Sequence, residues 1–308
     1  MGNKLVAALL TLIIVSGLIC PYPAFAHNFG ADENASWLAK IAEIKTEMGL
    51  VAKHVGNTSV INYYSNALGM YWNANDTLKM GDMNTTLQTE IPSAINATIS
   101  DAQAGNQVSV STDVLKLNTY LDESVSERVD KNSIDNSTMR ALAVAYVLQD
   151  ALGKYGNALN SKIDLNDMSE MNMSGGSSMS GMSDMSSMSS TIVDQNAYEN
   201  SIGLATTAQN MFTDLAANNT DKSDANTKIS TAFAKLIQDL DAKSDANTIM
   251  VDSHVKLHPV LITAYNIQEV SEANTGVSAV PEFPLPALLI VISITGVVVA
   301  TRFRPLGF

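Results

Sequence analysis

Seven methionines lie in one stretch of 23 residues, 168–190, in which Ser and Gly fill most of the other positions. Thioether sulfur is a soft, neutral ligand that suits Cu(I) and is poor for Mg²⁺, Ca²⁺ or Fe(III). A Gly/Ser-rich chain is expected to be flexible, so several sulfurs can gather around one ion with little strain. The stretch therefore predicts a Cu(I) site formed by Met168, Met171, Met173, Met179, Met182, Met185 and Met188. The alternative is a low-complexity linker in which methionine has no role.

Histidines supply the second group of candidate metal ligands. His254 and His258 are four residues apart in a stretch expected to be helical, so their imidazoles should lie on one face. This spacing suits two nitrogens on one ion, and among divalent metals nitrogen ligands of this kind favour Cu(II). The alternative is a hydrogen-bonded structural pair. His54, at the edge of an apolar stripe, is predicted to be structural.

The N-terminus has the features of a secretory signal peptide, residues 1–26. Lys4 precedes an apolar run, and Ala24-Phe25-Ala26 forms a small-x-small cleavage site; a membrane anchor is the alternative. Cleavage would remove Cys20, the chain's one cysteine, and so exclude disulfides and thiolate ligands. It would also leave His27 as the first residue, where its α-amine and ring together could chelate Cu(II), unless cleavage falls elsewhere or the terminus frays.

The C-terminus predicts a transmembrane helix with an outward-facing body. Residues 283–301 are uncharged and mostly apolar, long enough to cross a bilayer, and Arg302 and Arg304 follow on the expected cytoplasmic side. The Pro281-Glu282-Phe283 motif, the apolar stretch and the short basic tail together resemble the PEF-type sorting signals of archaeal surface proteins. The predicted signal covers residues 282–308. The resemblance implies processing by an archaeosortase-like enzyme; residues 273–281 would be a spacer.

Composition narrows the classes of function. The formal charge of −13 argues against a nucleic-acid partner. The chain has no Gly-x-Ser-x-Gly, phosphate-binding Gly loop or carboxylate pair of defined spacing, so we predict no enzymatic activity. Asn-x-Ser/Thr triplets on an exported chain are candidate glycan acceptors; they begin at Asn34, Asn57, Asn75, Asn84, Asn96, Asn136, Asn172 and Asn218.

The body between these ends is predicted to be all-α, because apolar residues recur at spacings of three and four, as from Trp37 to Val55. We expect about eight helices, with Pro92 and Pro259 kinking or breaking theirs. They should form two tandem antiparallel bundles: residues 27–160, then, after a Met/Ser/Gly-rich segment at 161–191, residues 192–272 packed with helix 135–158. The predicted helices are 33–55, 58–80, 83–104, 110–130, 135–158, 192–217, 224–242 and 245–270.

Two weak internal matches predict that the bundles arose by duplication. Residues 64–69 (YSNALG) match residues 198–203 (YENSIG), and residues 114–121 (VLKLNTYL) match residues 254–261 (HVKLHPVL). The two matches keep the same order and nearly the same offset. In the first copy, Val114 and Asn118 stand where the second has His254 and His258, so the histidine pair would belong to one half only.

The methionine pattern resembles the Met-rich segments of extracytoplasmic copper-handling proteins. With the predicted export and anchor, it implies a cell-surface protein that captures, buffers or passes on copper, with other envelope copper proteins as partners. Two alternatives stay open: a structural or adhesive envelope glycoprotein without a metal role, and a redox enzyme that uses copper at His27.

Overall fold

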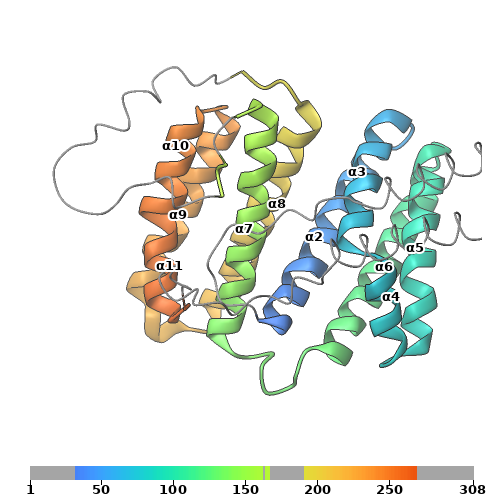
Figure 1. The fold of residues 1–308 in the computed structure, drawn as a ribbon, viewed down its shortest axis with the longest axis horizontal. Helices are drawn as coiled ribbons and strands as arrows, with labels where there is room; N and C mark the ends of the chain where they lie inside the picture. Colours follow the sequence, from blue (N-terminus) through green and yellow to red (C-terminus); the bar gives the residue numbers. More distant parts are fainter. Residues whose placement is uncertain (1–31, 162–163, 167–190, 269–308) are drawn as a thin grey trace, which may run out of the picture. The chain divides into compact units, whose positions relative to one another are not determined.

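The computed structural model describes residues 32–161, 164–166 and 191–268. All regular secondary structure in these residues is helical, as the all-α prediction requires (Figure 1). Six of the predicted helices are found as single helices with ends within three residues of those expected: α2 (Glu33–Lys53), α5 (Thr85–Gln103), α6 (Gln107–Arg128), α7 (Ser137–Leu159), α8 (Gln195–Ala217) and α9 (Ser223–Asp241).

The other two predicted helices are divided. The stretch 58–80 forms α3 (Thr58–Tyr71) and α4 (Ala74–Gly81), because Asn73 and Asp76 make a capping box that starts a new helix. The stretch 245–270 forms α10 (Ala246–Met250), the π-helix η4 (Val251–Leu257) and α11 (His258–Tyr265). A short 3₁₀ turn, η3 (Thr220–Lys222), precedes α9.

The helices pack as two groups. In the first, α2 contacts α3, α5 and α6, while α5 lies against α4 and α6. In the second, α7 contacts α8 and α11, and α9 packs against α8, α10, η4 and α11. The helix α2 also lies beside α7 and α8 (Figure 1), and apolar residues of both groups belong to one continuous core. The helix α7 is buried nearly all round, as its apolar sequence predicts.

The two prolines behave differently. Of the expected kink or break at Pro92, the break does not occur, because α5 runs on through that residue. Pro259 stands in the first turn of α11, directly after η4. In an α-helix its ring would collide with the carbonyl of Val255. The wider π-helical turns before it, in which the N–H of His258 donates to the carbonyl of Ser253, relieve that conflict.

Several predicted segments lie outside the described residues: the signal peptide 1–26, the Met-rich stretch, the spacer and the sorting signal 282–308. No helix within 32–161 or 191–268 is long and apolar enough to cross a membrane. The predicted transmembrane segment is not part of these ranges.

Candidate functional site

The described residues include the histidine pair but not the methionine ligands. Met168 to Met188, His27, Asn172 and the Pro281–Phe283 motif lie outside them. His254 lies in η4 and His258 begins α11, and both side chains are buried. The site can therefore be built from the histidines outward.

The two imidazoles face each other, as the spacing predicts. Nδ1 of His254 lies 3.1 Å from Nδ1 of His258, and the ring centroids are 5.0 Å apart. Two nitrogens bound to one ion at about 2.0–2.1 Å are separated by roughly 2.8–3.4 Å for angles between square-planar and tetrahedral. The same distance fits an N–H···N hydrogen bond, so the pair has the geometry for a proton or for a metal ion between the rings.

A backbone carbonyl sets the tautomer of His254. Its Nε2 lies 2.8 Å from the carbonyl oxygen of Leu165. A carbonyl only accepts, so Nε2 carries the proton and Nδ1 presents its lone pair toward His258. Metal-ligating histidines usually donate their second nitrogen to a carbonyl or carboxylate in this way. Leu165 is also the residue three positions before Met168 in the sequence.

Two glycines on α7 face Leu165 and Asn166. A Cβ at Gly153 would lie 2.7 Å from Nδ2 of Asn166, and a Cβ at Gly156 would lie 3.5 Å from Cγ of Leu165. Leu165 is buried in the resulting contact. The chain thus lies close along α7, with the tightest approach at Gly153, and its Leu165 carbonyl is aimed at His254.

The charged residues beside the histidine pair form ion pairs with one another. Lys235 of α9 binds Asp239 at 2.5 Å, and Lys256 of η4 binds Asp252 at 2.6 Å. A hydrogen bond with Asp252 lowers the pKa of Asp239, while burial and then the same bond raise the pKa of Asp252. Each carboxyl thus has its own lysine, and the two ion pairs lie where α9 packs against η4.

No cluster of three or more His, Cys, Asp or Glu side chains with metal-binding geometry occurs in the described part of the chain. The histidine pair supplies two nitrogens, so a copper ion there would need further ligands. Its donor chemistry fits copper, and thioether sulfur is the kind of ligand that would complete a soft site.

His54 is structural in the described chain. Its Nε2 lies 2.6 Å from Oε2 of Glu199, which also accepts from Tyr64 at 3.0 Å and pairs with Lys53. Burial alone would raise the pKa of Glu199, but these three hydrogen bonds outweigh it and lower the pKa. The cluster ties the end of α2 to α8.

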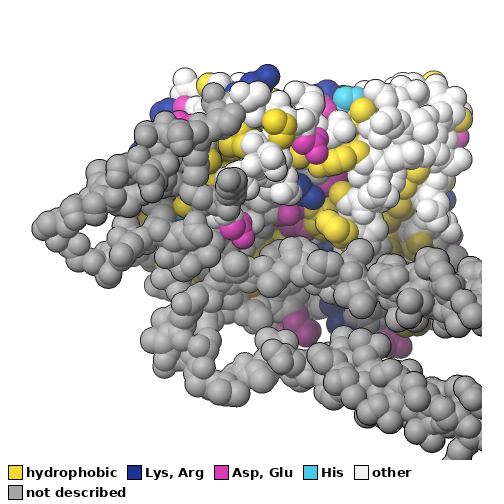
Figure 2. Space-filling model, turned by 45° about the horizontal axis from the view of Figure 1, so that its top comes forward, with side chains coloured by type: hydrophobic (Ala, Val, Ile, Leu, Met, Phe, Trp, Pro, Cys, Tyr) yellow, Lys and Arg dark blue, Asp and Glu magenta, His cyan; other side chains and the backbone are white. Residues whose placement is uncertain are grey.

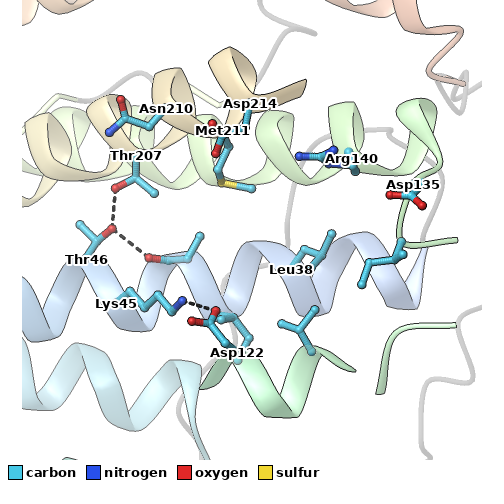
Figure 3. A pocket seen from close by; sticks show the side chains of 14 residues that line it. Leu38, Lys45, Thr46, Asp122, Asp135, Arg140, Thr207, Asn210, Met211 and Asp214 are labelled. Carbon is cyan, nitrogen blue, oxygen red and sulfur yellow. Dashed lines mark hydrogen bonds and ion pairs between the residues drawn. The ribbon is translucent and has the colours of Figure 1, made fainter. Parts of the chain in front are cut away.

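A groove of about 650 Å³ runs between α2, α6, α7 and α8 (Figure 3). Its apolar wall includes Leu38 and Met211. Lys45 crosses to Asp122 of α6, and Thr46 hydrogen-bonds Thr207 of α8 at 2.7 Å. Arg140, Asp135 and Asp214 also line it, so the groove has charges of both signs and favours no single ligand charge.

Most candidate glycan acceptors in the described residues are exposed: Asn57, Asn75, Asn96, Asn136 and Asn218, with Asn34 and Asn84 half-buried. Asn57 and Asn136 cap helices through their side-chain oxygens, which leaves the amide nitrogen available for a glycan, whereas the amide nitrogen of Asn84 donates to Oε1 of Glu127 at 3.4 Å. The face in Figure 2 is mostly uncharged, with scattered charges of both signs on the described residues.

No protein-family model, curated protein or solved structure matches the chain.

Proposed function

We propose that this is a cell-surface copper-binding protein that captures, buffers or passes on copper outside the membrane. The thioethers of the Met-rich segment hold Cu(I), and His254 and His258 supply nitrogen ligands, with His27 as a third nitrogen site for Cu(II). A protein of this kind is a carrier rather than an enzyme.

One observation carries the proposal: the contact between His254 and Leu165. The histidine pair is 86 residues from Met168 along the chain, yet His254 Nε2 lies 2.8 Å from the carbonyl oxygen of a residue three positions before that methionine. Three residues span at most about 10 Å. Sulfur and nitrogen ligands thus come from parts of the sequence that share one anchor point.

The cellular setting belongs to the same proposal. A signal peptide exports the chain, and the C-terminal helix with its Pro-Glu-Phe motif holds it at the outer face of the membrane or hands it to an archaeosortase-like enzyme. Other envelope copper proteins are the expected partners. The two helix groups would descend from a duplicated bundle, supported by aligned leucines that are fully buried in both copies: Leu117 with Leu257, and Leu121 with Leu261.

A Cu(I) titration of the full chain against a competing chelator tests the proposal. Replacing all seven loop methionines by Leu keeps their apolar character and removes sulfur, so Cu(I) affinity should be lost. Replacing seven loop serines by Ala is the matched control and should leave it intact. Wild-type protein that fails to compete with a chelator of modest strength would rule the function out.

The histidines are tested separately with His258→Gln, compared with His54→Gln as a control away from the pair. The first should weaken copper binding and the second should not. Equal effects would show that the pair is structural.

A second candidate is an envelope glycoprotein without a metal role, favoured by the five exposed acceptor asparagines. Mass spectrometry of the native protein distinguishes it. Glycans at these sites without measurable copper affinity would favour this alternative.

A further inference from the structure

Three carboxyl groups are gathered where the two helix groups meet. Glu43 and Glu47 lie four residues apart on α2, and Asp150 lies on α7. Glu47 is fully buried and Glu43 is 8% exposed. Such groups are rarely buried unless they are paired or neutral.

Hydrogen bonds join these carboxyls to both groups of helices. Nδ2 of Asn200 on α8 donates to Oε1 of Glu47 at 2.7 Å, and the hydroxyl of Tyr71 on α3 donates to Asp150. The remaining atoms of the first contact, Oε2 of Glu47 and Oδ1 of Asn200, have no hydrogen-bond partner among the described residues. Both atoms are acceptors while Glu47 is ionised, and a proton on Glu47 would turn one of them into a donor.

The charges at the junction do not balance without protons. One buried cation, Lys154 of α7, acts on both glutamates. Two buried carboxylates and the half-buried Asp150 against one ammonium would leave a net charge of about −2, most of it in a buried site, which is unfavourable. Protons on the two buried glutamates would remove the uncompensated charge, while Asp150 accepts a hydrogen bond from Tyr71.

We propose that Glu43 and Glu47 bind protons in the folded protein in mildly acidic to neutral solution, where ordinary carboxyl groups are ionised, and that this proton-loaded junction holds α2 and α3 against α7 and α8. Loss of the protons in alkaline solution turns the junction from an attractive contact into a repulsive one. The protein then has a pH-sensitive joint between its two helix groups.

The direction of the pKa shifts agrees with the geometry. Burial, then Asp150, raises the pKa of Glu43 well above its ordinary value. Burial raises the pKa of Glu47 to about 7, against the opposing hydrogen bond from Asn200. Burial, followed by the charge of Asp150, also raises the pKa of Tyr71, which keeps its hydroxyl a donor.

Other charged groups around α2 are engaged elsewhere. Lys40 acts on Glu43 but is bound at 2.8 Å to Asp76 of α4, and Lys45 is bound to Asp122 of α6. Glu90 of α5 pairs with Lys116 of α6. At the α8 side, Glu199 is held by Lys53, His54 and Tyr64, and Asp194 acts on Tyr63 rather than on the glutamates. None of these groups supplies the missing positive charge.

The variant Glu47→Gln tests the proposal on the full chain. Glutamine imitates a protonated glutamate permanently and can both accept from and donate to Asn200. We expect Glu47→Gln to raise the Tm by roughly 5 °C more at pH 8.5 than at pH 5.5. Glu123→Gln, at an exposed position of α6, should give no pH-dependent difference.

Hydrogen exchange supplies a readout specific to the joint: amide exchange in α2 should speed up in the wild type between pH 6 and 8.5, beyond the intrinsic effect of pH, and stay slow in Glu47→Gln. Infrared absorption of protonated carboxyl groups in the wild type at pH 7.5, reduced in the variant, tests the protons directly. A variant no more stable than the wild type at pH 8.5, or wild type without protonated carboxyl absorption, would overturn the proposal.

Discussion

Two pairs of titratable side chains, each four residues apart on a helix, are buried in this protein and differ in how their burial is compensated. His254 and His258 are neutral as imidazoles and bond to each other and to a backbone carbonyl. Glu43 and Glu47 become charged when they lose their protons. The one amide that donates to Glu47 does not compensate for burying that charge, so the protonated form is favoured. In both pairs helical spacing brings the side chains together. The residue type then decides whether a metal ion or a proton is the natural occupant of the space between them.

The largest effect should come from removing the amide partner of Glu47. Asn200→Leu keeps a similar volume but leaves both oxygens of the buried carboxyl without a partner, which should cost about 3 kcal/mol of unfolding free energy. Urea denaturation measures it, with the exposed Asn210→Leu on the same helix as the control. Copper affinity should not change, because the histidine pair is a separate site; a loss of both would contradict that separation.

At the histidine pair, the contact between α7 and Leu165 should matter for affinity more than for stability. Gly156→Leu would collide with Leu165 and move its carbonyl from His254. If the proposed copper function holds, Cu(I) affinity should fall roughly 10–100-fold, as for other lost partners of metal ligands. Gly156→Ala, whose Cβ is accommodated at 3.5 Å, should bind like the wild type. Chelator competition measures both, and equal affinities for all three proteins would refute the role of Leu165.

The stability of the wild type should fall as pH rises. Glu47 has a folded-state pKa of about 7 against an ordinary value of 4.5, so between these values the folded chain binds a proton that the unfolded chain lacks. Unfolding free energy then decreases by about 1.4 kcal/mol per pH unit, or about 2 kcal/mol between pH 5.5 and 8. Glu43 acts in the same direction, and the lowered pKa of Glu199 matters only at more acidic pH. Denaturation midpoints that rise over this interval would contradict the assignment.

The smallest effect should come from the edge of the carboxyl cluster. Tyr71→Phe removes the hydroxyl that donates to Asp150 and should cost about 1 kcal/mol. Tyr120→Phe removes a hydrogen bond to the partly exposed Glu90 and should cost less. Thermal or urea denaturation of the two variants compares them; a larger loss for Tyr120→Phe would argue against a tightly bound junction.

The sequence predicts the helices and the meeting of His254 with His258, because both follow from local periodicity. It does not reveal Leu165 as the partner of His254, since that contact joins segments 89 residues apart in the sequence. The sequence analysis does not predict the carboxyl cluster either, although Asp150 within the apolar run of α7 indicates a charged group close to the core. The division at Asn73 was readable too, from the Asn-x-x-Asp capping pattern.

The number of residues in the π-helical stretch before Pro259 determines how the two imidazoles are oriented. One residue corresponds to about 100° of rotation in an α-helix. Deleting the exposed Val255 would tighten η4 toward ordinary α-helix and turn one imidazole away from the other without taking a side chain from the core. The pairing of the rings thus depends on the number of residues in η4 as well as on the two histidines, so inserting or deleting one residue there would separate the rings without changing either histidine.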